Sequence, residues 1–293
     1  LPICLFYDEH AEYNIDIPGQ SEDLFERLKT CTDPSEIELT DLIEQLNNYI
    51  SDQFIDLNNH ERPLQLFHEL IRRPQCMRPI EIVSAFFNSD YFNKSVDSNN
   101  AIATHIIDTF FGTENDSPIT QKENAIRIRF PSTTEKIEAE SFSGLPECQF
   151  IYIPASVKEI GDKAFANCPK LQFVFIPRYG ELSKIGKGAF ANCSSLYSFS
   201  FPDNVEIVPS HAFENDGELV DIDFNQVEDI EPYAFANCLK ISKLDFPSAV
   251  KTIKEYAFKR LPHSTPIRFG TKTKRRWTPN ISSNAFPLYT FKF

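Results

Sequence analysis

The second half of the chain repeats one short pattern, and this repeat constrains the fold more than any other feature. Seven phenylalanines recur at intervals of 22 to 28 residues, and each follows an Ile or Val by five residues. They are Phe142, Phe165, Phe190, Phe213, Phe235, Phe258 and Phe286. A period of about 20 to 29 residues with one strand per repeat is typical of a solenoid, in which each repeat forms one coil.

Each repeat also contains a short apolar strand that usually ends at a proline, as in Leu171 to Pro177 and Leu196 to Pro202. The positions six, three and one before the proline are apolar, so we expect them to form the core with the repeated Ile and Phe. Burial of each Phe should contribute roughly 1.5 to 3 kcal/mol. The positions four and two before the proline should point out of the sheet.

The motif that begins at Ile160, Ile-Gly-x-x-Ala-Phe-Ala-Asn-Cys-x-x-Leu, resembles the BspA-like leucine-rich repeat family of bacterial surface proteins and of parasitic protists such as trichomonads. The resemblance covers roughly residues 122–290, and three units carry Ala-Phe-Ala-Asn-Cys in full. It implies a leucine-rich repeat solenoid of about seven units over residues 122–293, with a parallel strand face. For much of the family it also implies an adhesin role.

The first part of the chain differs in charge and in apolar spacing. Residues 1–115 carry 21 acidic and 7 basic side chains, which argues against nucleic-acid binding there. Apolar residues recur at helical spacing and indicate about five amphipathic helices. We therefore predict an arm over 1–20, an acidic helical domain over 21–115, and an α+β fold class in which this helical domain precedes the solenoid. The helical part is at most similar to helical regions that precede repeats in protist proteins.

An asparagine and a cysteine recur two and three positions after the repeated Phe. The asparagines are Asn167, Asn192, Asn215 and Asn237, and the cysteines are Cys168, Cys193 and Cys238. We predict that the asparagines form a buried structural ladder that satisfies backbone groups of adjacent coils. The cysteines should be small buried thiols. A disulfide between neighbouring coils is conceivable by position, but a free stacked pair is favoured.

The outward strand positions carry four large aromatic residues on two successive coils, flanked by arginines and aspartates. A solvent-facing sheet has no folding reason to carry such residues, and exposed aromatic surface usually marks an interface. The predicted partner-binding surface comprises Phe150, Tyr152, Phe173, Phe175, Tyr197, Arg127, Arg129, Asp221, Asp223 and Asp245. Two alternatives stay open: the acidic helical half or the N-terminal arm folds back over the aromatics, or they bind a small ligand or glycan.

A basic insert lengthens the last repeat and is a second candidate site. It contains Lys272, Lys274, Arg275, Arg276 and Trp277. These side chains could bind an acidic protein tail, phosphates or an anionic membrane. The alternatives are a solvated loop that caps the solenoid and a nuclear localisation signal.

The sequence offers little for an enzyme. His68-Glu69 lacks the second His of a zinc-protease helix, and nine glycines form no phosphate-binding loop. We therefore predict no catalytic residues, no metal and no cofactor, with an unrecognised Cys/His site as the enzyme alternative. No apolar run reaches the roughly 18 residues that a membrane span needs.

The pattern of residues favours a non-enzymatic interaction protein with a protein partner. Seven cysteines without a Cys-x-x-Cys pair favour a reducing compartment. We therefore expect a cytoplasmic scaffold, for example within a cytoskeletal assembly. The alternative is a cell-surface adhesin, which would require a leader ahead of Leu1.

Overall fold

A computed structural model describes most of the second half of the chain and a few residues before it. The described ranges are 119–122, 125–270 and 279–287, together with residues 84, 87, 88, 90–97, 103, 104, 107, 108 and 111. The chain divides into two compact units, Leu1–Ile107 and Asp108–Phe293. The second unit contains the repeats, and Asp108 and Phe111 belong to it.

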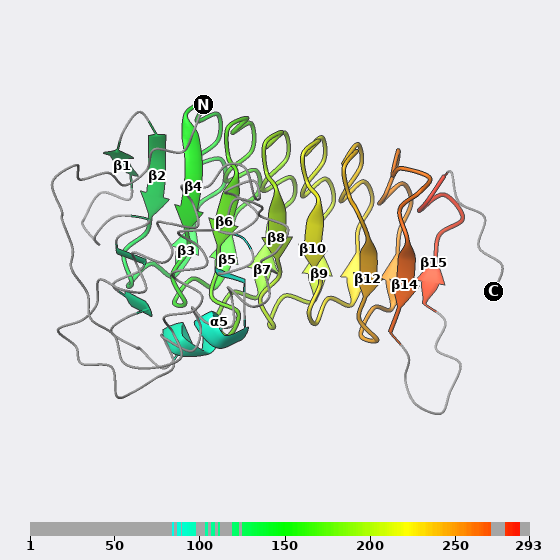
Figure 1. Cartoon of the computed structure of the whole chain (residues 1–293), viewed down its shortest axis with the longest axis horizontal. Helices are drawn as coiled ribbons and strands as arrows, with labels where there is room; N and C mark the ends of the chain where they lie inside the picture. The colour runs from blue at the N-terminus through cyan, green and yellow to red at the C-terminus, as the bar shows by residue number, and fades with distance from the viewer. Residues whose placement is uncertain are drawn as a thin grey trace, which may run out of the picture. The chain divides into compact units, whose positions relative to one another are not determined.

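The described repeats form a β-solenoid with two strand faces (Figure 1). The first face is made by β2 (Ala125–Arg129), β4 (Cys148–Tyr152), β6 (Phe173–Phe175), β8 (Ser198–Ser200), β10 (Asp221–Asp223), β12 (Leu244–Phe246) and β14 (Ile267–Phe269). The second face is made by β3 (Lys136–Ile137), β5 (Glu159–Ile160), β7 (Lys184–Ile185), β9 (Ile207–Val208), β11 (Asp229–Ile230), β13 (Thr252–Ile253) and β15 (Asn280–Ile281).

Each coil contributes one strand to each face, so β2 and β3 form the first coil and β14 and β15 the seventh. About six turns separate β2 from β14. The strands of neighbouring coils that pair do so in parallel, but β6 and β8, β10 and β12, and β7 and β9 are not paired, so the first face comprises three sheets and the second face two. One strand departs from this rule: β1 (Ile119–Lys122) pairs antiparallel with β2. In the described chain β1 therefore covers the first edge of the sheet, which would otherwise expose unpaired backbone groups.

The core is a column of the repeated phenylalanines. From Phe142 to Phe286 each ring stacks on the next, with centroids 4.8 to 5.8 Å apart and interplanar angles of 2 to 23°. The β-branched residue five positions earlier, such as Ile160, is buried in the same core, as is the strand residue Leu171. The core positions expected from the repeat are thereby confirmed.

The predicted α+β fold class with an N-terminal helical domain is wrong. Among the described residues a parallel β-solenoid is the dominant structure, and the only helix with defined ends is α5 (Asp90–Asp97). Apolar spacing alone could not establish the domain, because helical periodicity is a local pattern and does not show that helices pack together. The arm over 1–20 and most of 21–115 lie outside the described residues.

Candidate interaction surfaces of the solenoid

The aromatic residues of the first three coils lie side by side on the strand face, as their positions in the repeat require. Parallel pairing places Arg127 opposite Phe150 and Arg129 opposite Tyr152. The next pair of strands places Phe150 opposite Phe173 and Tyr152 opposite Phe175. Two rows therefore run across β2, β4 and β6, each with an arginine followed by two aromatic rings.

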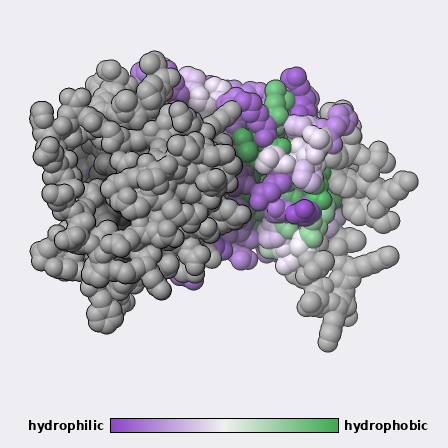
Figure 2. Space-filling model, in the orientation of Figure 1, coloured by the Kyte–Doolittle hydropathy of each residue, from purple (hydrophilic) through white to green (hydrophobic). Residues whose placement is uncertain are grey.

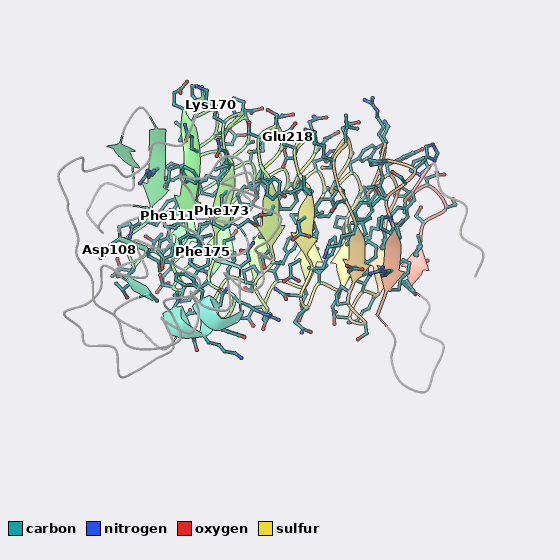
Figure 3. All side chains as sticks on the ribbon, viewed as in Figure 1. Asp108, Phe111, Lys170, Phe173, Phe175 and Glu218 are labelled. Atoms are coloured by element: carbon teal, nitrogen blue, oxygen red, sulfur yellow. The ribbon has the colours of Figure 1, made fainter. Side chains whose placement is uncertain are left out.

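These aromatic side chains are not exposed, which corrects the premise of the predicted interface. Phe150, Phe173 and Phe175 are fully buried, and Tyr152 is 9% exposed. Within the second unit, the ring of Phe111 lies 5.6 Å from Tyr152 and 6.4 Å from Phe175, measured between centroids (Figure 3). Phe111 falls in the segment predicted as helical, so these two contacts agree with the fold-back alternative for this row.

The two arginines of the rows are buried as well. Arg129 forms an ion pair with Asp108, and its guanidinium lies 5.5 Å from the ring centroid of Tyr152. Arg127 lies 5.9 Å from the ring of Phe150. Cation–π contacts of desolvated arginines stabilise the charge that burial would otherwise penalise. The surface that looked like a binding patch is thus part of the folded interior.

Sequence reasoning missed Asp108 and Phe111, although both sit three residues apart on one helical face. That spacing lets the acid meet Arg129 while the ring meets Tyr152 and Phe175. The available signal was that an acid and an aromatic residue, Asp108 and Phe111, lie close together in sequence, and that Arg129 lies beside aromatic residues on the predicted strand face. It was weak, because it becomes visible only when the rows of the strand face are already known.

The later coils present charged residues on the same face, and these are accessible. Asp223, Lys243 and Asp245 are exposed and Asp221 is half-buried. Lys243 Nζ lies 3.9 Å from Asp221 Oδ1 and 3.6 Å from Asp245 Oδ2. Figure 2 shows hydrophilic residues interspersed with hydrophobic ones on the coloured surface over this part of the solenoid.

Tyr197 completes the predicted set, and Arg268 is a neighbouring residue that the set did not include. Arg268 on β14 is exposed and lies opposite Asp245, with a 3.9 Å separation between Nη1 and Oδ1. Tyr197, directly ahead of β8, is half-buried. The predicted basic site, Lys272, Lys274, Arg275, Arg276 and Trp277, lies outside the described residues.

The asparagines form the predicted ladder, but with different partners. Each side-chain amide donates to the amide oxygen of the preceding coil: Asn192 to Asn167 at 2.9 Å, Asn215 to Asn192 at 2.8 Å, and Asn237 to Asn215 at 2.7 Å. The partners are therefore side chains rather than backbone groups, and the ladder is exposed rather than buried. All four residues have φ between 60 and 69°, a left-handed conformation that Asn tolerates.

The cysteines that follow the asparagines are buried and free, as predicted. Cys193 donates its thiol to the carbonyl of Phe165 at 3.2 Å, and Cys238 donates to Phe213 at 3.1 Å. Burial raises the pKa of both thiols, so they stay protonated and are poor nucleophiles. Their position in the core does not suit catalysis.

The fourth coil places Asp216 where its neighbours carry cysteine. The carboxyl is fully buried, its Oδ1 accepts the backbone N–H of Cys193 at 2.8 Å, and its Oδ2 has no hydrogen-bond partner. Burial raises the pKa of Asp216 well above its ordinary value. Among the described side chains no group of three or more His, Cys, Asp or Glu could hold a metal ion, and no helix there is long and apolar enough to cross a membrane.

A family model for the BspA type leucine-rich repeat region matches this chain in six copies, over residues 119–238 and 183–288. Together these matches span more than half of the 293 residues. The chain therefore belongs to this leucine-rich repeat family, which confirms the resemblance of its motif. No curated protein matches the sequence.

Several solved structures resemble the fold at low identity. The pneumococcal vaccine antigen PcpA is 22% identical with a TM-score of 0.42, over 52% of this chain and 38% of that one. A leucine-rich repeat protein from Eubacterium ventriosum is 22% identical with a TM-score of 0.40, over 59% and 55%. A leucine-rich repeat protein from T. pallidum is 25% identical with a TM-score of 0.42, over 52% and 82%. This chain thus spans about half or less of the first two relatives.

Proposed function

We propose that the chain is a non-enzymatic interaction protein that binds a protein partner through the strand face of β10, β12 and β14. The observation that carries the proposal is the row of accessible charges formed by Asp221, Asp223, Lys243, Asp245 and Arg268. The ion pairs within this row are 3.6 to 3.9 Å long, and their side chains are 44 to 77% exposed. Exposed pairs of this kind contribute little to folding, so the four side chains that form them remain able to pair with a partner.

The shape of the repeat supports the same role. The core and the asparagine ladder join neighbouring coils without using the outward strand positions of β10, β12 and β14, so these positions can vary without loss of the fold. Charged residues at an interface mainly set specificity and the rate of association. The expected partner therefore presents alternating charge, with basic groups that meet Asp223 and Asp245 and acidic groups that meet Lys243 and Arg268.

The test reverses two charges on this face in the full-length protein. Proteins captured by proximity labelling of the tagged wild type would be purified, and their affinities measured for wild type and for Asp223→Lys with Asp245→Lys. We expect the affinity of a direct partner to fall at least tenfold, with a smaller salt dependence. Glu255→Lys, an exposed charge reversal elsewhere, is the matched control. If every partner binds the double variant and wild type equally, the strand face is not the interface.

We also propose that the protein works in a reducing compartment as a cytoplasmic scaffold, for example one associated with the cytoskeleton. The supporting observation is that Cys148, Cys168, Cys193 and Cys238 are free, although two of them occupy adjacent coils. Thiols persist where glutathione keeps them reduced. Imaging of the tagged full-length protein, together with surface biotinylation of intact cells, tests the setting. Biotinylation would instead support the adhesin alternative that the family resemblance implies.

A further inference from the structure

The junction between the third and fourth coils departs from the repeat in three ways. The third coil is longer than its neighbours, since 25 residues separate Phe165 from Phe190 against 23 in the adjoining coils. In the position directly after the short strand, the fourth coil carries Pro209 where the third carries Gly186. Two positions before the repeated Phe, the first, second and fourth coils carry an exposed side chain, whereas the third coil carries the buried Gly188.

Pro209 interrupts the hydrogen bonds of the second strand face. At the other coil junctions, the residue after the short strand donates its backbone N–H to the preceding coil. These donors are Gly161, Gly186, Glu231, Lys254 and Ser282, at 2.7 to 2.9 Å. Proline has no N–H to donate. In the described part of the chain no backbone hydrogen bond joins β7 to β9, and the second face divides into two sheets there.

A cleft of about 590 Å³ opens along this break. Ile207 and Pro209 line one side, and Gly186 lines the other. Ile207 is 50% exposed, the largest fraction among the large apolar side chains of the described ranges. Residues of β7 and β9, on the second strand face, line the cleft, so it is separate from the charged strand face proposed above.

The two ends of the cleft carry opposite charges. Lys187 follows β7 at one end, and Glu206 precedes β9 at the other. Neither side chain forms an ion pair with a described residue. The other charged lining residues are engaged: Lys184 pairs with Glu159 at 2.8 Å, Glu231 pairs with Lys254 at 2.6 Å, and Asp162 accepts the backbone N–H of Lys187 at 2.7 Å.

The spacing of these features matches an extended peptide. Lys187 and Ser210 occupy the same position in neighbouring repeats. Glu206 lies four positions before Ser210, which corresponds to about 13 Å of extended chain along the coil. In an extended guest, side chains i, i+2 and i+4 point to one side and span the same length. Such a guest could place charged side chains at both ends and an apolar side chain on Ile207.

We propose that this cleft binds an extended segment of a protein partner, with an acidic, an apolar and a basic residue at alternate positions. The acidic side chain pairs with Lys187, the apolar side chain packs on Ile207 and Pro209, and the basic side chain pairs with Glu206. The missing hydrogen bond at Pro209 is thus the one break in the pairing of the described second strand face, and the cleft lies along it. This inference rests on the proposed role as a protein-interaction module, and adds a second surface with a defined ligand chemistry.

The test begins with a library of displayed random nonapeptides, from which those that bind the full-length protein are selected. The enriched peptides are then synthesised, and their affinities are measured by fluorescence polarisation. We expect enriched sequences to carry the acidic, apolar and basic residues at alternate positions. Ile207→Asp should weaken binding at least tenfold. Lys187→Glu should replace the preference for an acidic residue with one for a basic residue, which a merely structural role would not do.

Pro209→Gly separates binding from folding. It restores the N–H and allows the missing hydrogen bond to Ile185, so it should close the cleft and weaken peptide binding while the thermal midpoint stays equal or rises. Leu239→Asp, at another exposed apolar residue, is the control and should leave binding unchanged.

The cleft proposal fails if no peptide is enriched, if enriched peptides bind Ile207→Asp as tightly as wild type, or if Lys187→Glu leaves the charge preference unaltered. Each outcome is independent of the strand face, because Asp223→Lys with Asp245→Lys should still bind the selected peptides. If the double variant loses partner binding and the peptide selection fails, the results support the strand-face interface and contradict the cleft proposal.

Discussion

At the scale of single residues, Asp216 is a buried carboxylic acid at a repeat position that holds a cysteine in other coils. The slot holds a buried cysteine in the second, third and fifth coils, where the thiol meets a carbonyl. A carboxyl fits the same volume, but its Oδ2 lacks a partner, so the neutral acid is the form that this site tolerates. Folding is therefore coupled to protonation of Asp216.

The sign of this coupling follows from the pKa of Asp216, which burial raises in the folded state. The unfolded carboxyl loses its proton near pH 4, whereas the folded one retains it. The stability contribution is full below about pH 4 and is lost as pH rises toward the folded pKa. Asp216→Asn should therefore be more stable than wild type by roughly 1 to 3 kcal/mol at pH 8, and equal near pH 4.

Urea unfolding of both proteins across this pH range checks the prediction. Asp223→Asn, at an exposed carboxyl in the next coil, is the control and should leave the profile unchanged. If the free energy of unfolding of the wild type does not fall relative to that of Asp216→Asn above pH 4, the carboxyl is ionised in the folded protein and its charge is stabilised there.

The asparagine ladder depends on both the amide and the backbone conformation. Asn192 donates to Asn167, accepts from Asn215, and has φ of 62°. Asn192→Ala loses both hydrogen bonds and strains the left-handed backbone, so we expect a loss of about 2 kcal/mol. Asn192→Gly loses the hydrogen bonds but tolerates the conformation, and should cost about 1 kcal/mol. Equal losses in urea unfolding would mean that φ is not a constraint here.

At the scale of elements, the repeat could be assigned from the sequence, whereas burial of the strand face could not. Phe165, Asn167 and Leu171 recur because each coil imposes the same local geometry on the same position. Phe150 and Phe175 occupy outward positions, and their burial includes a contact with Phe111, which is distant in sequence. A periodic pattern shows which way a side chain points and does not show what covers it.

The contact of Phe111 with Tyr152 and Phe175 gives a prediction at this scale. Phe111→Ala removes a fully buried ring, so we expect a loss of about 3 kcal/mol in the free energy of unfolding. Binding of a hydrophobic dye should rise at the same time, because Tyr152 and Phe175 lose their cover. Leu239→Ala, at an exposed apolar residue, should change neither quantity. A stable Phe111→Ala variant without added dye binding would show that the ring is dispensable.

At the scale of the whole molecule, a solenoid is stabilised by contacts between neighbouring coils, so its ends need protection. In the described chain β1 protects the first edge of the strand face, and Asp108 and Phe111 cover part of that face nearby. The sequence suggested a helical domain over residues 21–115 and a solenoid from 122. The structure includes Asp108 and Phe111 in the same compact unit as the repeats.

Two fragments distinguish these boundaries. Residues 108–293 keep the ion pair of Asp108 with Arg129 and the stacking of Phe111, whereas residues 119–293 keep every described coil but lose both. We expect both to form the solenoid by circular dichroism, with the longer fragment more stable by about 3 kcal/mol and with less dye binding. Because repeat arrays unfold through neighbouring contacts, the loss should destabilise the first coils most in hydrogen exchange. If the first coils are equally protected from hydrogen exchange in both fragments, the boundary of the folded unit lies after residue 111.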